Sequence, residues 1–138
     1  SIQIFTTADL MNKTDGARKE WAEFKTAVLS KNIAAMLEMM KPDVEIYRGG
    51  KTLSISLPYS AFVAKPDREF ITALIGPSNS VLQQIVQMDP IRELRLSTEI
   101  GMGVVYKFPD GKILNEIAFF PFNGRYRVYE VAFRERDN

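Results

Sequence analysis

Three polar side chains, Tyr106, Asn115 and Glu130, fall on a strand face that is otherwise apolar. A carboxylate in apolar surroundings is a good proton acceptor, because burial disfavours its charged form. Glu130 beside the phenol of Tyr106 is therefore the best catalytic candidate. The alternative is that Glu130 pairs with a nearby arginine or lies at a wet rim.

The residue types that are missing limit the chemistry further. The 138 residues include no histidine and no cysteine. The usual general base near neutral pH, thiolate chemistry and disulfides are thus excluded. The acidic residues show no metal-ligand spacing, so we expect no metal and no cofactor.

The polar residues belong to three predicted antiparallel strands between Leu94 and Arg134. Apolar and polar residues alternate from Leu94 to Phe108, the period of a strand with two unlike faces. Asp110-Gly111 and Asn123-Gly124 then separate apolar runs, and both dipeptides favour two-residue hairpin turns. Two such turns place Tyr106 opposite Asn115.

The register assigns each side chain to a face, since residues opposite one another share one. One face collects Met102, Val104, Tyr106, Phe108, Ile113, Asn115, Ile117, Phe119, Tyr126, Val128, Glu130 and Ala132. The other collects Glu99, Lys107, Leu114, Glu116, Ala118, Phe120, Arg127, Tyr129, Val131 and Phe133. A slip of one residue in either turn would exchange the faces.

Helices are predicted before these strands. Residues 1–14 form an N-terminal arm, and residues 15–138 form one domain. Ala17, Trp21, Phe24 and Val28 make an apolar stripe on a helix from about 17 to 29. A second helix over 33–40 ends before Pro42. A hairpin is predicted over 43–57, and helices over 68–75 and 81–88. Asp89-Pro90 then ends the helical segment before the long strand.

This order of elements resembles the nuclear transport factor 2-like superfamily. The helix pair carries the likeness in the pattern Trp21-x-x-Phe24-x-x-Ala27-Val28, Asn32-Ile33-x-x-Met36-Leu37 and Pro42-Asp43-Val44. The resemblance implies an α+β cone: N-terminal helices packed on a strongly curved antiparallel sheet, with a pocket at the wide end. The insert over 58–90 is longer than the resemblance implies. The superfamily contains enzymes, accessory ligand-binding domains and dimerisation modules, so the fold alone does not choose among them.

Three functions follow as hypotheses. The first is a small-molecule-binding or accessory domain with a mainly apolar pocket and a small apolar ligand. The second is an isomerase, dehydratase or cyclase that uses Glu130, and the third is a protein-interaction module. Whether the chain is an enzyme stays open, although no catalytic constellation is evident. The expected pocket residues are Trp21, Met36, Met102, Tyr106, Asn115, Phe119 and Glu130.

The second face of the sheet has no segment left to cover it. Contiguous exposed apolar surface more often marks an interface than bare surface. We therefore expect a homodimer through this face. The expected interface residues are Leu114, Phe120, Tyr129, Val131 and Phe133.

Composition excludes some partners. Eighteen basic and 17 acidic residues leave a net charge of +1, whereas nucleic-acid binding needs a dense basic surface. No apolar run approaches the length of a membrane span. We expect a soluble protein, cytoplasmic or exported after removal of an unseen signal segment.

Overall fold

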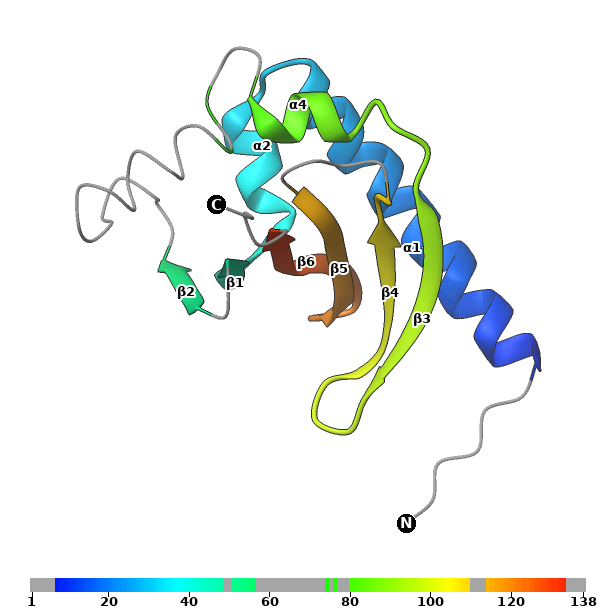
Figure 1. Cartoon of the computed structure of the whole chain (residues 1–138). Coiled ribbons are helices and arrows are strands. Elements are labelled where there is room, and N and C mark those ends of the chain that lie inside the picture. The colour runs from blue at the N-terminus through cyan, green and yellow to red at the C-terminus, as the bar shows by residue number, and fades with distance from the viewer. Residues whose placement is uncertain are drawn as a thin grey trace.

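The computed structural model describes residues 7–48, 51–56, 74, 76, 80–109 and 114–133 (Figure 1). A long helix and a short one precede the first two strands, and another short helix precedes the last four. The elements are α1 (Thr7–Leu29), α2 (Ile33–Glu38), β1 (Met40–Arg48), β2 (Lys51–Ser56), α4 (Val81–Ile85), β3 (Ile91–Ser97), β4 (Gly101–Lys107), β5 (Leu114–Phe122) and β6 (Arg125–Phe133).

The strands form one six-stranded sheet in the order β2-β1-β6-β5-β4-β3. Neighbours pair antiparallel except β1 and β6, which pair parallel. The α+β class is confirmed, but the expectation of a wholly antiparallel sheet is wrong at this pair. β1 and β6 are far apart in the sequence, so their pairing leaves no trace in local periodicity. Strong curvature stays a prediction.

α1 begins at Thr7, ten residues before the predicted start at Ala17. Residues 7–14, assigned to an N-terminal arm, thus belong to the helix. The predicted stripe of Ala17, Trp21, Phe24 and Val28 is confirmed, because all four side chains are buried.

α2 is shorter than predicted. The side chain of Asn32 caps it by accepting a hydrogen bond from the N–H of Ala35, at 3.1 Å. Met40 and Pro42 lie in β1, not at the end of a helix. β1 accommodates Pro42 where its pairing with β6 is interrupted, between Met40 and Glu45.

The next segments fit the prediction more closely. β1 and β2 pair as the expected hairpin, with Arg48 facing Lys51; Gly49-Gly50 lies outside the described residues. The predicted helix over 68–75 also lies outside them, apart from the helical and buried Leu74. Ser80 caps α4 in a capping box with Gln83.

The long strand predicted from Leu94 to Phe108 is in fact two strands, β3 and β4, joined by a turn over residues 98–100. The hydroxyl of Ser97 accepts hydrogen bonds from the N–H groups of Glu99 and Ile100, both at 3.3 Å. Gly101 then takes a φ of 100°, a conformation that glycine adopts without strain. Ser97 and Gly101 are the local features that the alternation concealed.

The hairpin at Asn123-Gly124 is confirmed, with Phe122 facing Arg125. The register between β4 and β5 differs, since Tyr106 faces Ile117 instead of Asn115. This shift is by two residues, so it leaves the predicted faces of the paired residues of β4 and β5 unchanged. A separate irregularity between Leu114 and Glu116 places Leu114 in the inner core.

A bulge in β6 overturns the predicted faces of its second half. Phe119 faces Val128 as expected, but the next residue, Ala118, faces Glu130. One extra residue in β6 therefore moves every later side chain to the opposite face. Glu130 lies on the same face as Ala118, and the prediction that it shares a face with Tyr106 is wrong.

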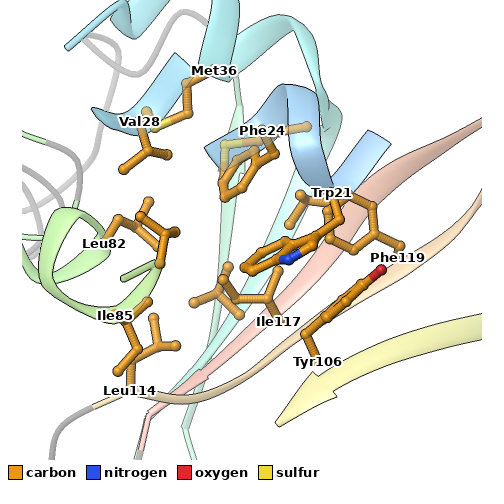
Figure 2. Packing of buried hydrophobic residues seen from close by; sticks show 14 of the residues in the cluster. Trp21, Phe24, Val28, Met36, Leu82, Ile85, Tyr106, Leu114, Ile117 and Phe119 are labelled. Atoms are coloured by element: carbon orange, nitrogen blue, oxygen red, sulfur yellow. The ribbon is translucent and has the colours of Figure 1, made fainter. Parts of the chain in front are cut away.

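The core lies between α1 and the inner face of the sheet, the face that carries Tyr106 (Figure 2). The Trp21 ring stacks on the Tyr106 ring with centroids 4.4 Å apart and planes 16° apart. The Phe119 ring makes T-shaped contacts with the rings of Trp21 and Phe24, with centroids 6.2 Å and 6.1 Å apart. These contacts fix the helix on the sheet.

A smaller cluster lies on the opposite, outer face. It consists of Val105, Ala118, Phe120 and Tyr129, with Ile100 and Phe122 against it. Gly103 is required here, because a Cβ atom would lie 2.4 Å from the Phe120 ring.

Replacing Trp21 by alanine should lower the free energy of unfolding by about 3–5 kcal/mol, through lost burial and the cavity left behind. Urea unfolding measures this loss. Circular dichroism is the signal to follow, because Trp21 is the only tryptophan and the variant has no tryptophan fluorescence. Leu29→Ala, at a side chain that is 46% exposed, is the control. A loss below about 1 kcal/mol for Trp21→Ala would contradict the packing.

Candidate functional site

A groove of about 410 Å³ lies where α1, α2 and the start of β6 meet. Its volume falls within the range of small-molecule sites. Its lining residues are Glu23, Ala27, Ala35, Glu38, Met39, Arg125, Tyr126 and Arg127. The lining thus combines four charged side chains with small and apolar ones.

Local structure explains how these residues meet. Glu23 and Ala27 are four apart on α1 and so lie on the same side of that helix. The Asn32 cap starts α2 soon after α1 ends and brings Ala35 beside Ala27. Two alanines facing one another leave space that larger side chains would fill.

A second cavity, of about 360 Å³, shares Glu23, Ala27 and Ala35 with the groove. Its other lining residues are Ala22, Thr26, Ser30 and Asn32. The groove therefore continues over the end of α1 and the start of α2.

The two arginines of the groove differ in their electrostatic partners. Arg125 Nη2 lies 2.8 Å from Glu23 Oε2, in an ion pair whose two side chains are both exposed to solvent. Arg127 Nη1 donates to the main-chain oxygen of Glu38 at 2.6 Å. Its Nε is buried without a hydrogen-bond partner. Among the described residues no carboxylate forms an ion pair with Arg127, so its charge is not neutralised.

A carboxylate and two phenols lie between α1 and the sheet, and one of the phenols, Tyr126, also lines the groove. Glu20 is buried, and its Oε2 has no hydrogen-bond partner. Tyr126 donates from its hydroxyl to the main-chain oxygen of Met102 at 3.3 Å. Burial, and secondarily the charge of Glu20, raises the pKa of Tyr126 to about 12.

Tyr106 has a denser set of partners. Its hydroxyl accepts from Arg92 Nε at 3.1 Å and donates to the main-chain oxygen of Ala17 at 3.4 Å. Burial raises the pKa of Tyr106, although the neighbouring Arg92 charge opposes the shift. Both phenols are therefore neutral near pH 7.

Most predicted pocket residues lie in or beside the packed core. Trp21, Met36, Tyr106 and Phe119 are buried in the main cluster, and Met102 is buried near it. Asn115 is half-buried, with an Oδ1 that has no hydrogen-bond partner. None of these residues lines either cavity described above. Their role in binding stays a prediction.

The residues predicted for the outer face are divided. Glu130 lies there, with its Oε2 4.0 Å from Arg95 Nη1. Phe120 and Tyr129 also lie there, as predicted. Leu114 and Val131 are buried in the inner core, so their placement on an outer interface is wrong. The side chain of Phe133 lies outside the described residues.

Glu20 and Arg127 are candidates that the sequence analysis missed. Glu20 is three residues from Ala17 and four from Phe24, so it lies on the buried stripe of α1. A charged residue on an otherwise apolar helical stripe is an exception that can be detected in the sequence. Arg127 gives no comparable indication, since charged residues are common on strand faces.

Two further findings concern the described ranges. No helix there is both long and apolar enough to cross a bilayer. No three acidic side chains there lie close enough to hold a metal ion.

The fold is similar to that of solved structures described as NTF2-like proteins. No family model and no curated protein matches the sequence. An NTF2-like protein of unknown function from Shewanella oneidensis is 9% identical, covers 89% of this chain and 98% of its own, and has a TM-score of 0.49. An NTF2-like protein with a cystatin-like fold from Novosphingobium aromaticivorans is 12% identical. It covers 95% of this chain and 90% of its own, with a TM-score of 0.48. The likeness to these structures is one of fold alone.

Replacing Tyr126 by phenylalanine should remove a component near pH 12 from the tyrosinate absorbance titration. The folded-state pKa exceeds the usual value near 10, so the unfolded chain loses this proton first. Stability contributed by Tyr126 is therefore present below pH 10 and lost as the pH rises toward 12. The variant should lose stability less steeply over this window in urea unfolding. Loss of a component near pH 10 instead would contradict the assignment.

Proposed function

We propose that this protein binds a small molecule in the groove between α1, α2 and β6. The observation that carries the proposal is the unneutralised guanidinium of Arg127 in a groove of about 410 Å³. An arginine without a carboxylate partner favours an anionic ligand, because a carboxylate or another oxyanion can accept two parallel hydrogen bonds from it.

The other lining residues indicate the shape of the ligand. Ala27, Ala35 and Met39 offer apolar surface for the body of the molecule. The flexible thioether of Met39 can adjust to its outline. We therefore propose a small organic acid with an apolar body as the ligand, in place of the small apolar ligand expected from the sequence.

The exposed pair of Glu23 and Arg125 supplies polar contacts at the side of the groove. Exposed ion pairs contribute only about 0–1 kcal/mol to stability. The pair can therefore rearrange around a ligand at little cost, with Glu23 accepting from a ligand hydroxyl or amine. Tyr126 is the only hydroxyl among the lining residues of this groove, and it donates to Met102. This lining supports binding more than catalysis.

Replacing Arg127 by glutamine should weaken binding of small carboxylic acids about tenfold or more, since a hydrogen bond to a charged group contributes roughly 1.5–3 kcal/mol. Two-dimensional NMR with linear and aromatic monocarboxylic acids measures the affinity. It also locates the ligand through the amides of Ala27, Ala35 and Met39.

The control is Arg125→Gln, which should weaken binding less because Glu23 already neutralises Arg125. Equal affinity of wild type and Arg127→Gln for an acid that shifts these amides would show that the arginine does not hold the ligand. Acids that shift only other amides would place the site elsewhere.

A second candidate function is carboxylate-dependent proton transfer of the isomerase or dehydratase type. The observation in its favour is the buried Glu20, whose Oε2 is unpaired beside two neutral phenols. Glu20 takes the role that the sequence analysis gave to Glu130, since Glu130 lies on the outer face. Such a carboxylate could remove a proton from a carbon next to a carbonyl group.

Deuterium incorporation separates the two functions. If Glu20 is a base, wild type in D₂O should exchange the α-hydrogens of a bound oxo acid, and Glu20→Gln should abolish the exchange. Wild type that binds the acid without exchange would leave ligand binding as the function. Glu20→Gln that exchanges at the wild-type rate would exclude Glu20 as the base.

A further inference from the structure

The strand β3 exposes three large apolar side chains at the edge of the sheet. Ile91 is 53% exposed, Leu94 38% and Leu96 52%. β3 ends the strand order, and β4 is its only neighbour among the described strands (Figure 1). An exposed edge strand offers unpaired N–H and C=O groups for pairing with another chain. By contrast, Phe120 and Tyr129 on the outer face are already largely buried.

We propose that β3 pairs antiparallel with β3 of a second copy, about a twofold axis that passes through Leu94. This inference is independent of the proposed ligand. It replaces the predicted dimer through the outer face, two of whose five interface residues lie in the inner core.

The two faces of β3 restrict the register. Arg92, Leu94 and Leu96 face Tyr106, Val104 and Met102 and so lie on the inner face. A twofold axis perpendicular to the sheet keeps the inner faces of both copies on the same side. Residues that face one another must therefore both be inner or both be outer. The axis then has to pass through a residue, and an axis through Leu94 pairs all seven residues of β3.

The charges select the same register. With the axis through Leu94, Glu93 faces Arg95 of the partner subunit, and this contact occurs twice. Moving the axis to Glu93 or Arg95 brings two like charges face to face, which is destabilising. The strand is thus complementary to itself in one register and repulsive in the two adjacent ones.

The existing ion pairs extend this pattern. Glu93 Oε2 lies 2.7 Å from Lys107 Nζ, and Arg95 Nη2 lies 2.9 Å from Glu116 Oε2. Glu93 is half exposed and Arg95 is 39% exposed, so both can make a further contact across the edge. The dimer would have a row of alternating charges on the outer face, from Lys107 through Glu93 to the partner's Arg95 and Glu116.

The inner face contributes apolar contact. Leu94 faces its own copy across the axis, and Leu96 faces Arg92 of the partner subunit, whose aliphatic stem can cover it. Such an edge pair is small beside standard protein interfaces, so we expect a dissociation constant on the order of micromolar.

Cysteine cross-linking tests the register directly, because the chain has no cysteine of its own. The two copies of Leu94 should lie roughly 5 Å apart between Cα atoms, within reach of a disulfide. Leu94→Cys should form a disulfide-linked dimer under mild oxidation. Leu96→Cys should not, since its copies lie roughly 13 Å apart along the strands. Leu29→Cys, at a similarly exposed leucine on α1, is the control.

Charge substitution at the axis tests the interface without oxidation. Leu94→Glu and Leu94→Lys should each be folded monomers in sedimentation, because each would bring like charges together. An equimolar mixture should form a heterodimer, whereas Leu29→Glu should remain a dimer. A monomeric wild type at several hundred micromolar would overturn the proposal. So would a dimer that survives Leu94→Glu but is lost on Phe120→Glu, which would place the interface on the outer face.

Discussion

The stacking of Trp21 on Tyr106 is the contact on which the rest of the architecture depends. It joins α1 to the C-terminal end of β4, with ring centroids 4.4 Å apart. Once Trp21 is fixed, the helical period sets its neighbours: Glu20 points toward the sheet, and Glu23 reaches the groove. The same contact buries Tyr106, which raises its pKa and keeps its hydroxyl neutral. One aromatic pair thus positions both the core and the candidate site.

Local patterns predicted the parts of this fold that local physics determines. The apolar stripe of α1 and the Asn123-Gly124 turn depend on residues a few positions apart, and both are confirmed. The turn between β3 and β4 was also local, since it needs only Ser97 and Gly101. Unbroken alternation concealed it, because an odd three-residue turn preserves the apparent period of two.

Two features lay beyond sequence reasoning because they are not local. The parallel pairing of β1 with β6 joins segments more than 80 residues apart. The bulge in β6 arises where that strand must pair with β5 and β1 at once. Its single extra residue moves Glu130 outward and Val131 inward, which changes the candidate site completely. The buried carboxylate is instead Glu20, which the helical period of α1 places beside the sheet.

The strand order keeps ligand binding and self-association apart. The groove takes its residues from α1, α2 and the start of β6, whereas the proposed dimer uses β3. β5 and β4 lie between β6 and β3, a separation of roughly 14 Å across the sheet. Pairing of β3 adds strands at an edge and covers no residue that lines the groove. A twofold dimer would therefore carry two separate grooves on one continuous sheet. Any coupling between them would have to pass through the packed contacts of β4 with α1, at Tyr106 and Trp21.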